Sequence, residues 1–368
     1  MKYTLGYEPK TFGDWAYLAI AQHFNKILKH QAGVIEDKDP EQLHQMRVGM
    51  RRLRSTLVGF GTALDLSTLA TEKEVGNIAK ILGKLRDIDV LEDTLKNFYQ
   101  PSLPHQEQKY LDQVVDALAK KRKKAYKTVN KIINHQKYIK FKKSFDHWLD
   151  NPTYQDIAGI SIHKVLPDLL LPQISKLILH PGWLVGINFM QGETQLPQGL
   201  SKEEITNLLN NQGLILHDLR KEAKRSRYNM ELFTQFYGET YQQYVKNTKQ
   251  LQTVLGDLQD SFILREFLDK FFQNNIEHKM PTLFDKLKSK RQERWQEWMV
   301  LQAKFLDSKV RKDFHLTILQ PSLVKSEINN GNHDVEKINS NDSNSIEANN
   351  ALNNESSSQN EEYIAISE

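Results

Sequence analysis

Two short basic segments have the residue types and the spacing needed to bind an extended anion. The first, residues 44–55, reads HQMRVGMRRLRS. On an α-helix, where each residue advances by about 100°, His44, Arg47, Arg51 and Arg54 fall on one stripe. A separate apolar stripe, typical of a core-facing surface, consists of Met46, Met50, Leu53, Leu57 and Phe60. The basic stripe would therefore border a buried face, with a plain solvated face as the alternative.

The second basic segment repeats the first. Residues 217–228 read HDLRKEAKRSRY, and His217 follows His44 by 173 positions. The motif LGKLRDIDVL, which begins at Leu82, returns after the same interval as LGDLQDSFIL, which begins at Leu255. Self-similarity at one fixed offset indicates internal duplication. At this offset His44, Arg47, Arg51, Arg52 and Arg54 match His217, Arg220, Lys224, Arg225 and Arg227.

Cations in this pattern are suited to a row of phosphate groups. Basic residues three or four positions apart place their charged groups about 5 Å apart along a helix axis, so successive phosphates can each meet one or two donors. Two such rows brought together would form a groove in which low-dielectric walls strengthen the positive field. His44 and His217 could donate as well, because a nearby anion favours the protonated form. For these two histidines a neutral hydrogen-bonding role is the alternative. The predicted ligand is a linear polyanion.

Two carboxylates are expected to orient the basic side chains. Asp87 and Asp260 occupy equivalent places in the two Leu-Gly motifs, on the helix that follows each basic helix. The alternative is a metal site formed by Asp87 and Asp89, since hard cations prefer carboxylate oxygens. The second half has Phe262 in place of Asp89. We therefore expect no dedicated metal site and no cofactor, apart from divalent cations that a phosphate ligand could carry.

Other cations are predicted as contributors to the electrostatic field rather than as assured ligand contacts. Arg86 belongs to the first Leu-Gly motif, where the second has Gln259, so the second half is the less typical one. The fourth helices of the two halves align at a slightly shorter offset than the rest of the repeat. For the basic residues of these fourth helices, a run of solvated surface charge is the alternative interpretation. The residues of this group are Arg86, Lys121, Arg122, Lys290 and Arg291.

The net charge of the chain combines two regions of opposite sign. The whole chain carries +4, but from Ser322 onward there are two lysines and nine acidic residues, a net charge of −7. This tail, 322–368, is rich in Asn and Ser and has no periodicity, which predicts disorder. It could be an inert solubilising segment or a weak competitor for the basic body. The preceding residues carry +11, which suits anionic partners.

The composition also indicates which cellular compartments and which kinds of site are compatible with the chain. The chain has no cysteine, which excludes disulfides, thiolate catalysis and Cys-type zinc sites. The N-terminal residues lack the basic and apolar regions of a secretory signal. The most apolar region is interrupted by Pro167, Pro172 and Pro181, whereas a membrane span requires about 20 consecutive apolar residues. We expect a cytoplasmic protein without a membrane span.

Helical periodicity dominates the remaining sequence, and strand-like alternation is scarce. The predicted fold class is all-α, with two homologous four-helix bundles related by an internal pseudo-twofold axis. The expected organisation is a first bundle at 11–150, a connector with short helices at 151–200, a second bundle at 201–310 and the tail at 322–368.

Several motifs of catalytic and phosphate-binding sites are missing from the sequence. GxxxxGK[ST], HExxH, GxSxG and ExExK do not occur. The prominent side chains are cations and hydrogen-bond donors, which bind charge better than they cleave bonds. A non-catalytic protein is predicted, and a metal-dependent polyphosphate- or triphosphate-processing enzyme is the alternative.

The doubled basic helix with its Leu-Gly motif resembles the CHAD family, the conserved histidine α-helical domain. The resemblance extends from about Thr11 to about Asp307. It implies two helical bundles around a central basic pore that binds inorganic polyphosphate. Many relatives are fused to a triphosphate-tunnel catalytic domain, whereas this chain resembles a stand-alone member. By motif position the pore would be lined by His44, Arg47, Arg51, Arg52, Arg54, His217, Arg220, Lys224, Arg225 and Arg227.

We therefore predict binding of inorganic polyphosphate, with polyphosphate granules or polyphosphate-metabolising enzymes as further partners. The alternative is RNA binding by the same cations. It is less favoured because Tyr228, Phe233 and Phe236 follow the basic face and do not interleave with it as base-stacking platforms would.

Overall fold

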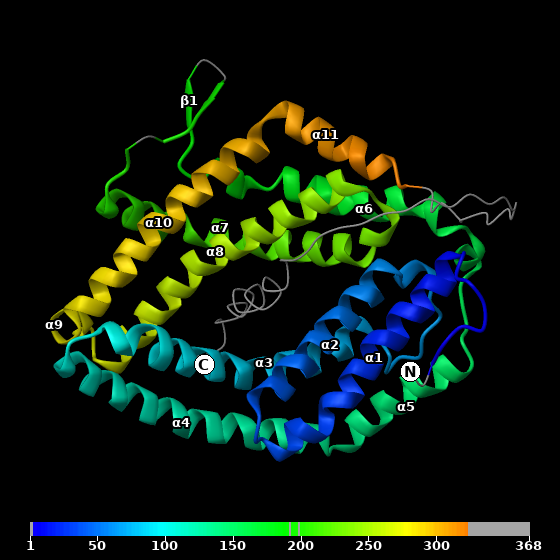
Figure 1. Cartoon of the computed structure of the whole chain (residues 1–368), viewed down its shortest axis with the longest axis horizontal. Coiled ribbons are helices and arrows are strands. Elements are labelled where there is room, and N and C mark those ends of the chain that lie inside the picture. The colour runs from blue at the N-terminus through cyan, green and yellow to red at the C-terminus, as the bar shows by residue number, and fades with distance from the viewer. Residues whose placement is uncertain (1–2, 191–192, 198, 323–368) are drawn as a thin grey trace, which may run out of the picture.

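The structure is almost entirely helical, which confirms the all-α prediction. It is a computed structural model that describes residues 3–190, 193–197 and 199–322 (Figure 1). Strands β1 (Asn188–Met190) and β2 (Glu193–Gln195) form a small antiparallel hairpin. The α-helices are α1 (Phe12–Glu36), α2 (Pro40–Gly59), α3 (Glu72–Asp93), α4 (His105–Ile133), α5 (Gln136–Asp150), α6 (Ile162–Ile178), α7 (Lys202–Leu232), α8 (Glu239–Phe271), α9 (Ile276–Lys279), α10 (Pro281–Leu306) and α11 (Ser308–Leu319).

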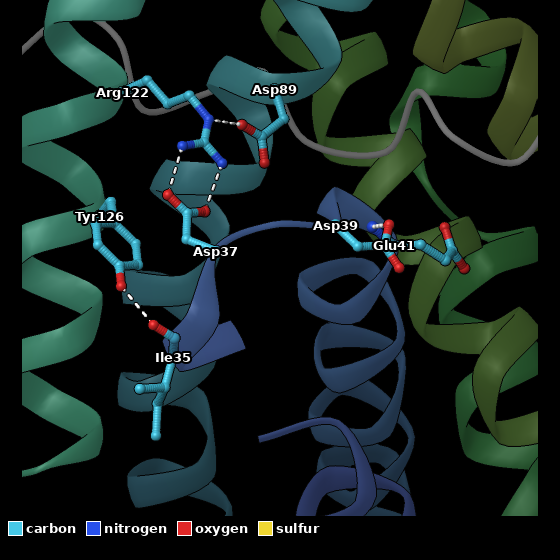
Figure 2. A network of polar contacts seen from close by, with 7 residues as sticks. All are labelled: Ile35, Asp37, Asp39, Glu41, Asp89, Arg122 and Tyr126. Atoms are coloured by element: carbon cyan, nitrogen blue, oxygen red, sulfur yellow. Dashed lines mark hydrogen bonds and ion pairs between the residues drawn. The ribbon is translucent and has the colours of Figure 1, made fainter. Parts of the chain in front are cut away.

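Local capping fixes the hairpin of α1 and α2. The Thr11 hydroxyl accepts a hydrogen bond from the Asp14 amide at 3.1 Å, and the Asp14 carboxylate accepts one from the Thr11 amide at 2.9 Å. This reciprocal arrangement satisfies two amides that a helix start leaves unpaired. Asp37 ends α1 in the left-handed conformation, with φ of 53°. Asp39 then caps α2 by accepting a hydrogen bond from the Glu41 amide at 2.9 Å (Figure 2). The short connection turns α2 back along α1.

The apolar stripe predicted for α2 is buried, as expected. Gly49 lies where α2 approaches α1 most closely, because a Cβ atom there would be 2.9 Å from Ile27 Cγ1 and 3.2 Å from the Ile27 backbone nitrogen. The glycine therefore sets the distance between the two helices. The buried residues of the stripe are Met46, Met50, Leu53, Leu57 and Phe60.

Substituting Gly49 by alanine is expected to lower the free energy of unfolding by about 1–3 kcal/mol, because an added methyl group would push against a packed backbone. Gly213→Ala is a matched control, since Gly213 also lies inside a helix and a Cβ there meets nothing within 4 Å. Chemical denaturation of both variants measures the difference. Equal stability of the two variants would contradict the close packing described here.

The two halves of the chain meet through equivalent residues. Helices α1 to α5 form one half of the molecule and α6 to α11 the other (Figure 1). Phe60 and Phe233 are counterparts in the sequence repeat, and their ring centroids lie 5.2 Å apart. Next to them, Gly59 of α2 faces Leu232 of α7. Contact between counterparts is what a twofold relation produces, so the pseudo-twofold axis passes beside the C-terminal ends of α2 and α7.

Two separate apolar cores hold the halves together. The larger includes residues of α1, α2, α5, α6, α7 and α11, and the smaller is shared by α3 and α4 with α8 and α10. Along α3, Leu85 belongs to the larger core and Ile88 to the smaller. Along α8 the same change occurs between Leu258 and Leu264. The two predicted orienting carboxylates, Asp87 and Asp260, fall at these changes, so each lies where the two cores adjoin.

The segment expected to be a connector contains a full helix. The 17-residue α6 packs on α7 and α11. We interpret α6 as the counterpart of α1, since each packs on the basic helix of its own half. Helices α5 and α11 likewise follow α4 and α10, so each half has one further helix in addition to the four of the predicted bundle. The tail predicted to be disordered, 322–368, lies outside the described residues apart from Ser322.

Candidate anion-binding groove

A groove of about 730 Å³ between α2, α3 and α7 is lined by six of the ten residues predicted to line the pore. Both rows of the sequence repeat face this one cavity, and further lysines of α3 and α7 join them. Among the described residues of its wall, the carboxylates are those of Glu72 and Asp87. The lining is therefore strongly positive. Its cations are Arg47, Arg51 and Arg54 from α2, Lys73 and Lys80 from α3, and Arg220, Lys221, Lys224 and Arg225 from α7.

Tyr228 connects the two rows inside the groove wall. The Arg51 guanidinium of α2 lies over the Tyr228 ring, with Cζ 4.9 Å from the centroid, and the Arg227 guanidinium of α7 lies 4.5 Å from the same centroid. The ring is only 7% exposed. Contacts of this kind hold a guanidinium in place without consuming its hydrogen-bond donors. Tyr228 therefore helps to fix the position of Arg51 in the groove wall.

The first turns of α3 form the opposite wall. Arg54 forms an ion pair with Glu72, and a Cβ atom at Gly76 would lie 3.3 Å from Arg54 Cζ, so the guanidinium lies close against the α3 backbone. The Arg54 side chain is 53% exposed. Such solvent-exposed pairs contribute little to stability, so Arg54 can exchange Glu72 for an anion in the groove at small cost.

Four of the ten residues predicted to line the pore lie elsewhere. Arg52 pairs with Glu231 at 3.3 Å, because its position on the α2 helix is away from the basic stripe. Arg227 is on the stripe, but it lies in the last turns of α7, where α2 and α7 converge; it is buried and 3.6 Å from Glu231. His44 is half-buried, and burial together with the charge of Arg86 lowers its pKa. The fourth residue is His217.

The imidazole of His217 is expected to be neutral at physiological pH. Burial, assisted by Lys221 and Arg220, lowers the pKa of His217 from 6.5 to about 4, and Nδ1 has no hydrogen-bond partner within the described residues. Burial lowers the pKa of His23 to about 4 as well. The donor role proposed for His217 would thus require an anion that reverses this shift.

These depressed pKa values predict a loss of stability in acid. As the pH falls from 6.5, the unfolded chain binds protons at His23 and His217 while the folded chain does not, so the free energy of unfolding decreases until about pH 4 and then levels off with respect to these two groups. Denaturant unfolding between pH 7 and 4 measures this slope. His217→Gln should make the slope shallower. An NMR titration midpoint for His217 near 6.5 would contradict the buried environment.

Asp87 and Asp260 lie where the two apolar cores adjoin. Asp87 is 5% exposed and lies in the groove wall. Both carboxylate oxygens of Asp260 are buried without a hydrogen-bond partner among the described residues, as are Nε and Nη2 of Arg220. Burial raises the pKa of Asp260 well above its usual value, and the charge of Arg220 opposes this rise. Arg220 is thus the groove cation electrostatically coupled to Asp260, and the orienting role of the two aspartates stays a prediction.

Arg122 has a structural environment (Figure 2). Its Nη1 and Nη2 donate to the Asp37 carboxylate at 2.8 and 2.7 Å, and its Nε donates to Asp89 at 2.7 Å. Hydrogen bonding to Asp37 raises the pKa of Arg122. One guanidinium therefore joins α4 to the end of α1 and to α3. Asp87 and Asp89 also point to different places, because residues two positions apart on a helix are about 200° apart, so they do not form a joint metal site.

The other cations of this group are also engaged with the protein. Lys121 lies over the Phe267 ring of α8, and Lys290 lies over Phe98, so each lysine reaches the opposite half. Arg291 is 1% exposed, and its Nε donates to the Ser261 hydroxyl at 3.0 Å. Its guanidinium lies 4.3 Å from the Phe262 ring centroid. Arg291 thus faces Phe262 as Arg122 faces Asp89, which agrees with the alignment of the fourth helices.

The described residues are 3–190, 193–197 and 199–322. Within them, no group of three or more His, Cys, Asp or Glu side chains is arranged to hold a metal ion. None of the helices in this part of the chain is both long and apolar enough to cross a bilayer.

The model of a known protein family matches the part of the chain that contains the basic helices. The model of the CHAD domain matches residues 18–269, more than half of the chain. The chain belongs to the CHAD family. The match covers both basic helices and both Leu-Gly motifs, so the repeat found in the sequence is part of the CHAD domain. None of the curated proteins matches the chain.

Two solved structures resemble this CHAD protein. The crystal structure of the CHAD domain from the plant Ricinus communis superimposes with a TM-score of 0.52 at 18% sequence identity, covering 85% of this chain and 94% of that one. PptA from Streptomyces chartreusis gives a TM-score of 0.56 at 14% identity, covering 80% of this chain and 100% of that one. At these identities the likeness concerns the fold.

Some residues of the CHAD groove were not anticipated from the sequence. Lys73 and Lys80 lie seven positions apart on the exposed side of α3, so a helical projection of α3 could have identified them. Lys221 lies within the second basic segment itself. Gln173 comes from α6, and no sequence signal pointed to it because α6 was not recognised as part of the second half.

Proposed function

We propose that the groove binds inorganic polyphosphate and that the protein is a non-catalytic binding module. The observation that supports this most strongly is the convergence of both basic rows on one cavity. Nine cations and two carboxylates line the described wall. A cavity with this excess of positive charge concentrates an anionic ligand, and membership of the CHAD family agrees with the proposal.

The spacing of the cations favours a phosphate chain over a single phosphate. Along α2, Arg47, Arg51 and Arg54 rise by about 5 Å per step, and Arg220 and Lys224 follow the same rule on α7. A single phosphate would occupy only part of either row, whereas a chain can meet one or two donors at each step. The ligand proposed is therefore linear and repeatedly charged.

RNA is a weaker candidate for this groove. Single-stranded nucleic acid is bound by aromatic side chains that stack on bases, in addition to cations. The aromatic ring in the groove wall belongs to Tyr228, and it is 7% exposed and faced by Arg51 and Arg227. A base cannot stack on a ring that two guanidinium groups already cover.

The proposed module is expected to bind polyphosphate without cleaving it. Within the described wall of the groove, nine cations outnumber the carboxylates of Glu72 and Asp87, and cations bind charge better than they cleave bonds. Incubation of the protein and polyphosphate with Mg²⁺ or Mn²⁺ should release no phosphate above the background. Sustained turnover would contradict the non-catalytic proposal and favour the alternative of a metal-dependent enzyme.

A competition titration tests the proposed ligand. Polyphosphate, RNA and free phosphate are compared at equal phosphate concentration over a range of salt concentrations. We expect polyphosphate to bind most tightly and its affinity to fall steeply with salt through counterion release. Displacement of polyphosphate by RNA at comparable charge concentration would overturn the ranking. A cytoplasmic protein with this activity would associate with polyphosphate granules or with enzymes that act on the polymer.

A further inference from the structure

A second concentration of positive charge lies outside the groove, on α4 and α5. Between positions 120 and 143 the chain has eleven lysine and arginine residues and no acidic residue. On α4, the lysines at 120, 123, 124, 127 and 131 fall within about 100° of one another on the helix, opposite the buried Val129 and Ile133. We call this the lysine surface; its exposed members are Lys120, Lys123, Lys124, Lys127, Lys131, Lys137, Lys140 and Lys143.

The lysine surface forms one edge of the molecule. Helices α4 and α5 follow one another along the lower edge in Figure 1. The inner side of α5 buries Phe141, Phe145 and Trp148, whereas Lys137, Lys140 and Lys143 of this helix are exposed. Arg122 points inward to Asp37 and Asp89 and does not belong to the surface. The exposed charges are therefore all ammonium groups on flexible stems.

An ion pair connects the lysine surface to the groove. Lys137 of α5 lies 2.6 Å from the Glu74 carboxylate of α3. The two residues before Glu74, Glu72 and Lys73, line the groove. The first turn of α3 thus has the groove on one side and the beginning of the lysine surface on the other. A long anion that leaves the groove at this wall meets Lys137 within one helical turn.

We infer that the lysine surface is a second binding surface for polyphosphate, which holds the part of a long chain that extends beyond the groove. This inference rests on the proposed function of the groove. Flexible ammonium groups act as point charges and suit a ligand that needs no fixed geometry, whereas the arginine forks of the groove orient individual phosphates. The groove would set affinity for any chain, and the lysine surface would add affinity that depends on length.

The surface favours a phosphate chain over a nucleic acid. The aromatic residues of this region are turned inward: Tyr138, Phe141, Phe145 and Trp148 are buried, and the Tyr126 hydroxyl donates to the Ile35 carbonyl at 2.5 Å (Figure 2). Exposed Phe, Tyr and Trp rings, on which bases stack, are thus absent from residues 120–150, all of which the structure describes. Charge alone is available for recognition, and a polyphosphate carries a negative charge at every unit of its chain and has no bases that need stacking partners.

The test compares long-chain polyphosphate with tripolyphosphate in two variants. The surface variant carries Lys120→Gln, Lys124→Gln, Lys127→Gln and Lys131→Gln. Its matched control removes the same charge from exposed lysines of the other half through substitution of Lys246, Lys249, Lys304 and Lys312 by glutamine. We expect the surface variant to bind long chains at least about tenfold more weakly, with a salt slope lower by as much as about 3. Tripolyphosphate affinity should stay unchanged in both variants.

Other outcomes separate this inference from the proposed function. Unchanged long-chain affinity in the surface variant, or an equal loss in the control variant, would overturn the inference. Loss of RNA binding with intact polyphosphate binding would overturn it in favour of a nucleic-acid surface. A groove variant with Arg47→Ala, Arg51→Ala and Lys224→Ala is measured in parallel. If that variant binds tripolyphosphate normally, the proposed function of the groove fails, whatever the lysine surface does.

Discussion

Replacing Arg47, Arg51, Arg220 and Lys224 by alanine is expected to weaken polyphosphate binding at least about a thousandfold at moderate salt. Each substitution removes a charged hydrogen-bond donor from the groove wall, and hydrogen bonds to charged groups contribute about 1.5–3 kcal/mol each. Even with strong non-additivity, four such losses exceed about 4 kcal/mol, which corresponds to three powers of ten in affinity. Titration calorimetry with a defined chain length measures the change.

Two controls make this result specific to the groove. Alanine at Lys246, Lys249, Lys304 and Lys312 removes an equal charge from exposed positions of α8, α10 and α11, and it should change the affinity only slightly. Because loss of Arg220 leaves the buried Asp260 without its coupled cation, the triple variant that retains Arg220 is compared as well. Native-like affinity in a folded quadruple variant would refute the groove as the binding site.

Removing Arg122 is expected to be the most destabilising single change among the predicted cations. Arg122→Leu leaves the carboxylates of Asp37 and Asp89 without their shared guanidinium, and the Asp89 side chain is only 6% exposed. Stranding one partner of a buried pair costs about 3–5 kcal/mol, and partial exposure of Arg122 and Asp37 reduces this to about 2–3 kcal/mol. Urea denaturation at pH 7 gives the value.

The pH dependence identifies the cause of this loss. Burial already raises the pKa of Asp89, and Arg122 opposes the rise. In the variant the folded-state pKa should therefore rise further above the unfolded value near 3.9. Above the folded-state pKa of Asp89, the loss of stability caused by Arg122→Leu is complete. As the pH falls from there toward about 4, Asp89 binds a proton in the folded variant and the loss of stability becomes smaller. Arg291→Leu is the control, because Arg291 faces Phe262 and its loss strands no carboxylate there. A penalty for Arg122→Leu that does not vary with pH would contradict this account.

Much of the fold could be predicted because the repeat keeps one offset through the basic helices and the Leu-Gly motifs. The offset of 173 residues aligned the basic helices and the Leu-Gly motifs, and the contact of Phe60 with Phe233 agrees with it. The second half was harder to divide into helices. Pro167 and Pro172 lie inside α6, although proline usually interrupts a helix. The carbonyls that lose a partner there belong to His163 and Asp168, which are not buried, so water can satisfy them.

The sequence predicted the rows of basic residues more completely than it predicted which single residues line the groove. Helical spacing correctly indicated that Arg47, Arg51 and Arg54 share a face, but it did not reveal where α2 and α7 converge. Where α2 and α7 converge, Arg227 is buried in contact with Tyr228 and Glu231. Arg225 remains in the lining of the groove. Partners from other elements were also invisible to the sequence, because Asp37 and Arg122 are 85 positions apart. Tertiary pairing of this kind decides which cations can reach a ligand.

The central claim, that two rows form one site, can be tested by stoichiometry. A short polyphosphate is titrated into the native protein, into Arg47→Ala/Arg51→Ala, which weakens the α2 row, and into Arg220→Ala/Lys224→Ala, which weakens the α7 row. We predict that the native protein binds a single chain, and that each variant still binds a single chain with lower affinity. Binding of two chains to the native protein, with each variant losing one and keeping the other at native affinity, would contradict a shared groove.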